Sequence, residues 1–195
     1  MFDFLHLKFY NSFMKKFVNG IFVGKFLPPH KGHIWAIKQA SQKCDKLFVV
    51  VCEAPEYCKQ LCQDAHMPYV DLKQKTQWMK EELKDIKNVK VVSFDESGIK
   101  TMPNGWAEWS EKLKDIVGEK IDVIFGSETD YAPYYAKYFK ESKYVLQDTL
   151  RTNVNISATK IRNNLGGNVD YIINSARPFF ENYLKTQNTN GAKNG

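Results

Sequence analysis

The sequence predicts an α/β fold in which a parallel sheet of about five strands carries helices on both faces. Two observations lead to this prediction. Short runs rich in β-branched and aromatic residues alternate along the chain with segments of helical periodicity. Because a helix is the usual connection between parallel strands, this alternation favours a parallel sheet. The chain has 195 residues, of which 43% are hydrophobic, so it can bury the core of one domain.

The predicted strands are five apolar runs along the chain. They comprise residues 20–23, 47–52, 89–94, 121–125 and 144–146. After the first strand, Ile34, Ile37, Ser41 and Cys44 recur at the spacing of one helix face. A second amphipathic helix, before the third strand, carries Trp78, Met79 and Leu83.

One domain is expected over residues 17–184. Residues 1–16 are predicted to be an N-terminal extension, because Met14 stands just before the first strand in the manner of a chain start. Residues 185–195 are polar and are predicted to be a disordered tail. No apolar run approaches the roughly 20 residues that a bilayer span needs, so neither a signal peptide nor a membrane anchor is expected.

The chain carries a formal net charge of +6, from 28 Lys and Arg against 22 Asp and Glu. This charge suits small phosphorylated ligands, and it is equally typical of a soluble protein with extra lysines. The sequence has no arginine-rich run and no alternating basic and aromatic strip. Nucleic-acid binding is therefore not expected.

The four cysteines indicate a reducing compartment, and we expect a cytoplasmic protein. Cys44, Cys52, Cys58 and Cys62 include no C-x-x-C pair, and nothing else suggests a disulfide-stapled fold. Cys58, Cys62 and His66 recur at four-residue intervals, which could gather zinc ligands on one helix face. Such residues without a metal are commoner, and no metal site is predicted.

The stretch "GIFVGKFLPPHKGH", residues 20–33, passes from a strand through a proline-rich loop into a helix. Gly24 lets the backbone approach a ligand, and Gly32 removes a side chain that would crowd a phosphate. His30 and His33 are three apart on a first helical turn, so both imidazoles can face one anion at the helix N-terminus. A lone histidine is more often a surface or core residue, but this pattern favours a phosphate site.

A second stretch, "RTNVNISATKIRNN", residues 151–164, has the same character. Ser157 and Thr159 stand where a helix would begin, and Arg162 lies one turn inside it. A hydroxyl N-cap, free backbone N–H groups and an arginine fork together form a phosphate clamp. Alone, this pattern is an ordinary capped helix. Ligands in parallel sheets bind beyond the carboxyl ends of the strands, so residues 24–33, 126–130 and 151–162 are expected to converge.

The two motifs together resemble the paired signatures of the nucleotidylyltransferase superfamily. "GKFLPPHKGH" and "ISATKIR" carry this resemblance. "PNGWAEWSEKLK" and "ARPFF" are similar to the adenylyltransferase domain of NadR-type nicotinamide-nucleotide adenylyltransferase and ribosylnicotinamide kinase proteins, over about residues 17–181. The resemblance implies a Rossmann-like nucleotidylyltransferase fold, and transfer of AMP from ATP to nicotinamide mononucleotide, giving NAD and pyrophosphate.

The resemblance also implies how the reaction is catalysed. The attacking phosphate is already ionised, so no general base is needed, and catalysis reduces to alignment and charge neutralisation. Lys25, His30, His33 and Arg162 are expected to supply the positive field. Mg²⁺ is expected on the substrate phosphates, held by their oxygens and water rather than by a carboxylate cage.

Two further groups of residues are implied to bind the substrates. The ATP-binding group is Gly24, Phe26, Gly32, Gly126, Ser127, Glu128, Ile156, Ser157 and Thr159. The acceptor-binding group is Asn104, Trp106, Trp109 and Arg151, in which an indole would stack on the cationic pyridinium. Three alternatives stay open: core packing for the tryptophans, an ordinary acidic loop residue for Glu128, and a structural ion pair for Arg151.

The sequence departs from the family pattern in places. It holds no G-x-x-x-x-G-K-[ST] loop and no room for an N-terminal helix-turn-helix, so kinase and repressor roles are expected to be absent. Where relatives carry "DRLRW", this chain has "KQKTQW", and Lys75 would replace an arginine contact weakly. A sister enzyme with another acceptor (phosphopantetheine, flavin mononucleotide or a cytidylyl acceptor) and a silent nucleotide sensor are the rival functions. The expected partners are small nucleotides, and a homo-oligomer stays open.

Overall fold

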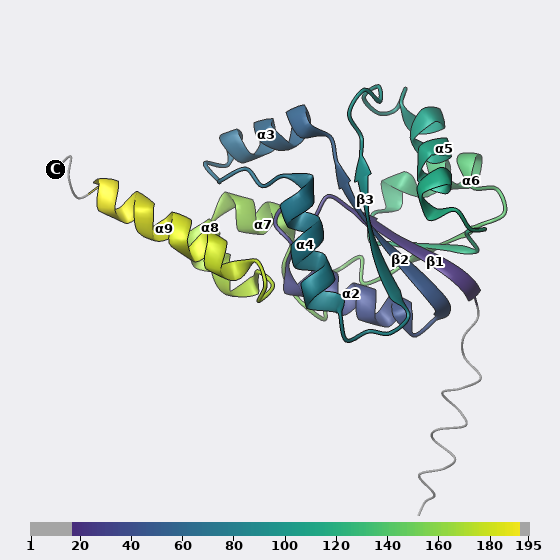
Figure 1. The fold of residues 1–195 in the computed structure, drawn as a ribbon, viewed down its shortest axis with the longest axis horizontal. Coiled ribbons are helices and arrows are strands. Elements are labelled where there is room, and N and C mark those ends of the chain that lie inside the picture. The colour runs from purple at the N-terminus through teal and green to yellow at the C-terminus, as the bar shows by residue number, and fades with distance from the viewer. Residues whose placement is uncertain (1–16, 192–195) are drawn as a thin grey trace, which may run out of the picture.

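The structure, a computed structural model, describes residues 17–191 and contains one parallel sheet of five strands (Figure 1). The predicted extension, residues 1–16, and the last four residues of the predicted tail lie outside the described residues. All five predicted strands are confirmed. They are β1 (Phe17–Gly24), β2 (Cys44–Glu53), β3 (Val89–Asp95), β4 (Val123–Gly126) and β5 (Lys143–Leu146).

The strand order is β3-β2-β1-β4-β5, and every neighbouring pair is parallel. The chain therefore builds outward from β1 to β3, returns to the other side of β1, and builds outward again to β5. The register brings Gly24 opposite Val51 and Gly126 opposite Leu146, so the carboxyl ends of these strands lie at one edge. The order reverses between β1 and β4, and that is where such sheets bind ligands.

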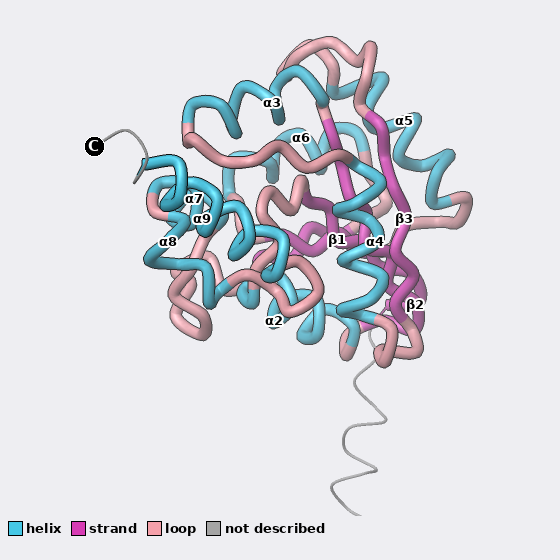
Figure 2. The backbone as a smooth tube through the Cα atoms, turned by 60° about the vertical axis from the view of Figure 1, so that its left-hand side comes forward, coloured by secondary structure: helices cyan, strands magenta, loops and turns pink. Residues whose placement is uncertain are grey.

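Helices cover both faces of the sheet, and two short 3₁₀ helices complete the fold (Figure 2). The helices are α2 (Lys31–Ser41), α3 (Pro55–Asp64), α4 (Leu72–Leu83), α5 (Trp106–Val117), α6 (Ala132–Tyr138), α7 (Ala158–Asn163), α8 (Leu165–Asn168) and α9 (Arg177–Gly191). The 3₁₀ helices are η1 (Thr129–Tyr131) and η2 (Val169–Tyr171). Among the described residues, none of the helices combines the length and apolar character that crossing a membrane requires.

Alternate residues of the central strands point to opposite faces and build two cores. Phe22 and Val49 belong to the core under α2, α4, α7 and α9. Ile21 and Phe48 belong to the core under α5 and α6. Figure 1 shows α5 and α6 on one side of the sheet and α2 and α4 on the other. Strands buried on both faces read as continuous apolar runs, which is why the sequence predicts them well.

Two details differ from the sequence-based expectations. Helix α2 ends at Ser41, and Cys44 is the first residue of β2, where its thiol donates to the Ala40 carbonyl at 3.5 Å. The helical spacing of Cys44 was therefore misleading. Helix α9 continues to Gly191, into the segment predicted to be disordered, because buried Phe180 anchors the helix start and each later residue adds one backbone hydrogen bond.

Lys75 on α4, the expected weak substitute for an arginine contact, is fully buried. Its Nζ lies 3.7 Å from Glu53 Oε1 and 3.5 Å from the Cys52 carbonyl oxygen. The Tyr69 hydroxyl donates to the same carboxylate oxygen at 2.6 Å. A charge removed from water needs such partners, so Lys75 holds α4 against the end of β2 rather than facing a ligand.

Lys75→Met should lower the free energy of unfolding by about 3 to 5 kcal/mol, because it leaves the buried Glu53 carboxylate without its cation. Urea unfolding measures this change. The double variant Lys75→Met/Glu53→Gln removes the stranded charge and should regain much of the loss. A single variant within about 1 kcal/mol of the unaltered protein would contradict the assigned ion pair.

Candidate active site

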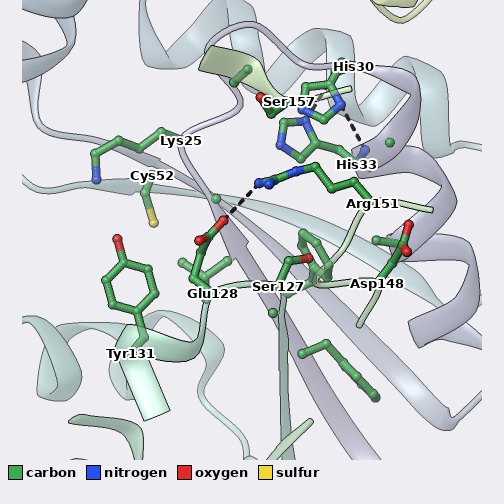
Figure 3. A pocket seen from close by; sticks show the side chains of 18 of the residues that line it. Lys25, His30, His33, Cys52, Ser127, Glu128, Tyr131, Asp148, Arg151 and Ser157 are labelled. Atoms are coloured by element: carbon green, nitrogen blue, oxygen red, sulfur yellow. Dashed lines mark hydrogen bonds and ion pairs between the residues drawn. The ribbon is translucent and has the colours of Figure 1, made fainter. Parts of the chain in front are cut away.

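A cavity of about 350 Å³ lies at the carboxyl ends of the strands (Figure 3). The segments after β1, β4 and β5 meet there, as the sequence predicts, and α5 closes one end. The cavity is lined by fourteen of the predicted site residues: Gly24, Lys25, His30, Gly32, His33, Trp106, Trp109, Gly126, Ser127, Glu128, Arg151, Ile156, Ser157 and Thr159. What each of them does there stays a prediction.

Three predicted site residues lie elsewhere. Phe26 and Arg162 line an adjoining cavity of about 330 Å³, which shares Lys25 and His33 with the first. Asn104 is exposed in the turn before α5 and lines neither cavity. The loop after β1 therefore separates two connected spaces, and both are within reach of Lys25.

His30 and His33 cap the start of α2 with a reciprocal pair of hydrogen bonds. His30 Nδ1 accepts from the His33 backbone N–H at 3.3 Å, and His33 Nδ1 accepts from the His30 backbone N–H at 3.2 Å. The two rings stack with centroids 3.5 Å apart. Because both Nδ1 atoms accept, each neutral ring carries its proton on Nε2. The capping pattern of a Ser and Glu helix start is thus built here from two imidazoles.

Both histidines are neutral near pH 7. Burial lowers the pKa of His30 to about 3, and the positive charge of Arg151 adds to the effect. Burial, His30 and Arg151 together lower the pKa of His33 well below its ordinary value. The expectation that these rings supply positive charge is therefore wrong for the structure as it stands. They offer two fixed N–H donors instead.

Close packing around the histidine rings explains why Gly32 and Phe26 stand where they do. A Cβ on Gly32 would lie 3.0 Å from His30 Nδ1, so glycine makes room for the capping imidazole, and its role toward a phosphate stays a prediction. Phe26, with 2% of its surface exposed, packs its ring edge-on against His33, with centroids 4.9 Å apart. Phe26 thus supports a histidine, and its contact with ATP stays a prediction.

The β4 side of the cavity carries an ion pair. Arg151 donates to Glu128 Oε1 at 3.1 Å, and Figure 3 shows its side chain extended past His33 toward Glu128. Arg151 thus forms an ion pair, as one of the two interpretations holds, and its contact with a phosphate stays a prediction. Both side chains are substantially exposed, at 40% and 58%, and exposed pairs stabilise a fold little. The pair can open for a charged ligand at small cost.

The second motif forms its predicted helix start, with a change in the role of its arginine. Ser157 is the N-cap of α7 and accepts from the Lys160 backbone N–H at 3.1 Å. Arg162 donates to the Leu27 carbonyl at 2.8 Å and to Thr159 Oγ1 at 3.0 Å. Part of the guanidinium group is therefore used to connect α7 to the loop after β1, and that part is not free to bind a phosphate in this structure.

The two tryptophans are packed in the core and also line the cavity. Each has 4% of its surface exposed, and their ring centroids lie 5.1 Å apart. Trp106 stacks on Tyr134 at 4.8 Å with nearly parallel rings. Trp109 donates its indole N–H to Glu96 Oε1 at 2.8 Å. The packing and ligand-binding interpretations are thus compatible, because both residues belong to the core and also line the cavity.

Glu96 is a cavity residue that sequence reasoning missed. It follows β3, is 9% exposed, and pairs with Lys25 at 3.3 Å. Burial by itself would lower the pKa of Lys25, but the Glu96 carboxylate raises this pKa above its ordinary value. Its position directly after β3 was the one indication, since the carboxyl end of β3 lies at the same edge of the sheet as those of β1, β4 and β5.

Within residues 17–191, no group of three or more His, Cys, Asp or Glu side chains is arranged to hold a metal ion. Cys58 and Cys62 are free thiols buried in the core, whereas His66 is exposed, so the four-residue spacing makes no zinc site. Mg²⁺ carried by substrate phosphates needs no such cage.

Comparison with known families decides the classification. The model of the Cytidylyltransferase-like family matches residues 21–164. The chain belongs to this family. Both motifs, the histidine pair and Ser157 with Arg162, lie inside the matched region, so the resemblance that they carry is confirmed.

Individual relatives narrow the comparison. The chain is 33% identical over 165 residues to the trifunctional NAD biosynthesis/regulator protein NadR of Escherichia coli, covering 83% of this chain and 40% of that protein. It is 26% identical over 146 residues to a nicotinamide-nucleotide adenylyltransferase of Pyrobaculum arsenaticum, covering 74% of this chain and 75% of that protein. The chain thus spans less than half the length of the NadR relative.

A solved structure of a NadR protein in complex with NR has the same fold. It superimposes with a TM-score of 0.63 at 26% identity, covering 82% of this chain and 44% of that chain. The predicted nucleotidylyltransferase fold is therefore confirmed.

His30→Asn should make the free energy of unfolding less dependent on pH. Asparagine keeps an N-cap acceptor but has no titrating group, so the contribution of the lowered His30 pKa is lost. Between pH about 6.5 and about 3, the unfolded chain binds a proton at His30 that the folded chain does not. The free energy of unfolding therefore falls as pH falls through this window, by up to about 1.4 kcal/mol per pH unit for one histidine.

Urea unfolding at pH 7.5, 6.5 and 5.5 measures the slope. The matched control His66→Asn removes an exposed histidine outside the cavity and reports the effect of losing a histidine as such. A slope that is the same in His30→Asn and in the unaltered protein would show that His30 is not held neutral.

Proposed function

We propose that this chain is a nicotinamide-nucleotide adenylyltransferase, which transfers AMP from ATP to nicotinamide mononucleotide and releases pyrophosphate. The observation that carries the proposal is the pair of neutral imidazoles, fixed by backbone N–H groups and facing a cavity that also holds Lys25 and Arg151. The names of the NadR and archaeal relatives support the choice of acceptor.

The neutral histidines suit the transfer of an adenylyl group. The 5′-phosphate of the acceptor attacks the α-phosphorus of ATP while the bond to the leaving pyrophosphate breaks, and no proton has to be removed from the nucleophile. His30 and His33 each present an Nε2–H donor, and donors already fixed in place stabilise the charge on the transition state without reorganising. Mg²⁺ carried by the substrates would supply further charge neutralisation.

The two partly exposed cations of the cavity, Arg151 and Lys25, have different roles in this proposal. Arg151 leaves Glu128 for a phosphate, and its guanidinium can bind two oxygens at once. Lys25 lines both cavities, so it can follow charge from the α-phosphate to the departing pyrophosphate. Arg162 keeps its bond to the Leu27 carbonyl and acts by fixing the loop, with at most part of its fork turned to the leaving group.

Pyrophosphate release from ATP and a panel of acceptors tests the proposal. The panel holds nicotinamide mononucleotide, phosphopantetheine, flavin mononucleotide and cytidylyl-type acceptors with CTP. We expect turnover with the nicotinamide nucleotide, and a loss of kcat of about 10²-fold or more in His33→Ala. Turnover with another acceptor alone, or with none of them in a folded protein, would overturn the proposal. Unchanged turnover in His33→Ala would remove that histidine from the mechanism.

Trp106→Leu and Trp109→Leu test whether the indoles bind the pyridinium. Leucine keeps apolar bulk but removes the aromatic face, so the loss of cation–π energy should raise KM for nicotinamide mononucleotide about ten-fold while KM for ATP stays within about two-fold. Trp78 is the matched control, because it is equally buried but packs on Phe179 and Phe180 outside the cavity.

Trp78→Leu should lower the melting temperature without raising KM for the nicotinamide substrate selectively. If Trp106→Leu and Trp109→Leu behave in the same way as this control, the two tryptophans only pack the core.

A further inference from the structure

Glu96 is held rigidly at the aromatic end of the cavity. Its backbone N–H donates to the Glu53 carbonyl at 2.7 Å, and its own carbonyl accepts from the Ile99 N–H at 3.1 Å. One carboxylate oxygen accepts from the Trp109 indole and the other lies 3.3 Å from Lys25 Nζ. The carboxylate therefore cannot turn away from the cavity without losing both partners.

The charges around the cavity set Glu96 apart from the other carboxylates that line it. Glu128 pairs with Arg151, and Asp148 accepts hydrogen bonds from Thr152 and Asn153. Of these three carboxylates, Glu96 is the one that accepts a hydrogen bond from a tryptophan of the cavity wall. A negative charge thus sits beside the aromatic surface on which a ring would stack.

The cation that balances Glu96 is the more mobile partner. The Lys25 side chain is 38% exposed, whereas that of Glu96 is 9% exposed. Lysine is a point charge on a flexible stem, and it lies where the two cavities join. When a phosphate enters, Lys25 can turn to it. The Glu96 carboxylate then faces the aromatic end of the cavity without its paired cation.

We propose that Glu96 is a specificity-determining residue that reads the charge on the acceptor's ring, favouring a pyridinium with an uncharged carboxamide over one with a carboxylate. The inference rests on the proposed function. Nicotinamide mononucleotide carries a cationic ring. Once Lys25 has turned to the phosphates of the reacting nucleotides, the Lys25–Glu96 pair is thus exchanged for two new pairs, Lys25 with phosphate and Glu96 with the ring. A ring carboxylate would instead bring a like charge toward Glu96, and this repulsion is the discriminating element.

Glu96→Gln separates charge from shape. Glutamine keeps the size of the side chain and an oxygen that can accept from Trp109, so the fold should be retained, whereas the negative charge is lost. We expect kcat/KM for nicotinamide mononucleotide to fall about ten-fold, and that for nicotinic acid mononucleotide to stay or rise. The ratio of kcat/KM for nicotinamide mononucleotide to kcat/KM for nicotinic acid mononucleotide should therefore fall about ten-fold or more. KM for ATP and the melting temperature should change little.

Two further variants make the test specific. Glu96→Asp keeps the charge and should retain most of the preference, although its shorter side chain weakens the bond to Trp109. Trp109→Phe removes the indole N–H but leaves the carboxylate, and should leave the substrate ratio within about three-fold of that of the unaltered protein. A preference that depends on charge should thus be lost when the carboxylate is neutralised and kept when the indole hydrogen bond is removed.

The outcomes are distinguishable. Equal losses for both mononucleotides in Glu96→Gln, or an unaltered protein without preference between them, would overturn the role of Glu96 while leaving the proposed function intact. A folded, unaltered protein inactive with both mononucleotides would overturn the proposed function and this inference with it.

Discussion

Two hydrogen bonds between the first turn of α2 and its own histidine side chains fix the centre of the cavity. Each of His30 and His33 uses Nδ1 to accept a backbone N–H at the helix start, and the His33 N–H also donates to the His30 carbonyl at 2.9 Å. The same bonds choose the tautomer, because a neutral ring whose Nδ1 accepts must carry its proton on Nε2. The stability of the helix start and the direction of the two donors therefore have one cause.

The surroundings of the histidines serve this arrangement. Gly32 leaves room for the His30 ring, Phe26 packs against His33, and Arg162 ties the loop to α7 through the Leu27 carbonyl. Beyond them, Glu96 joins the loop after β1 to α5 through its bonds to Lys25 and Trp109. Segments distant in sequence thus meet because the strand order reverses between β1 and β4.

Local signals in the sequence were sufficient for the sheet and for the position of the cavity. The five apolar runs became the five strands, and the two motifs fell at the carboxyl edge. The central strands β1, β2 and β4 are largely buried, so their apolar runs are continuous, whereas the edge strands β3 and β5 are only partly buried. What failed depended on contacts across the fold. The burial of Lys75 beside Glu53 has no signal in the sequence, and the charge state of His30 depends on burial that no spacing reveals. Glu96 was missed because a single acid after a strand has no distinctive pattern.

The account depends most on the histidines being neutral with the proton on Nε2. Long-range ¹H–¹⁵N NMR of the imidazole nitrogens, in the protein labelled at histidine and recorded from pH 7.5 to 5.5, observes the tautomer and the charge directly. For His30 and His33 we expect one protonated Nε2, one unprotonated Nδ1, and no titration across this range. A ring that titrates near pH 6.5, or that carries its proton on Nδ1, would contradict the reciprocal cap and the mechanism built on it.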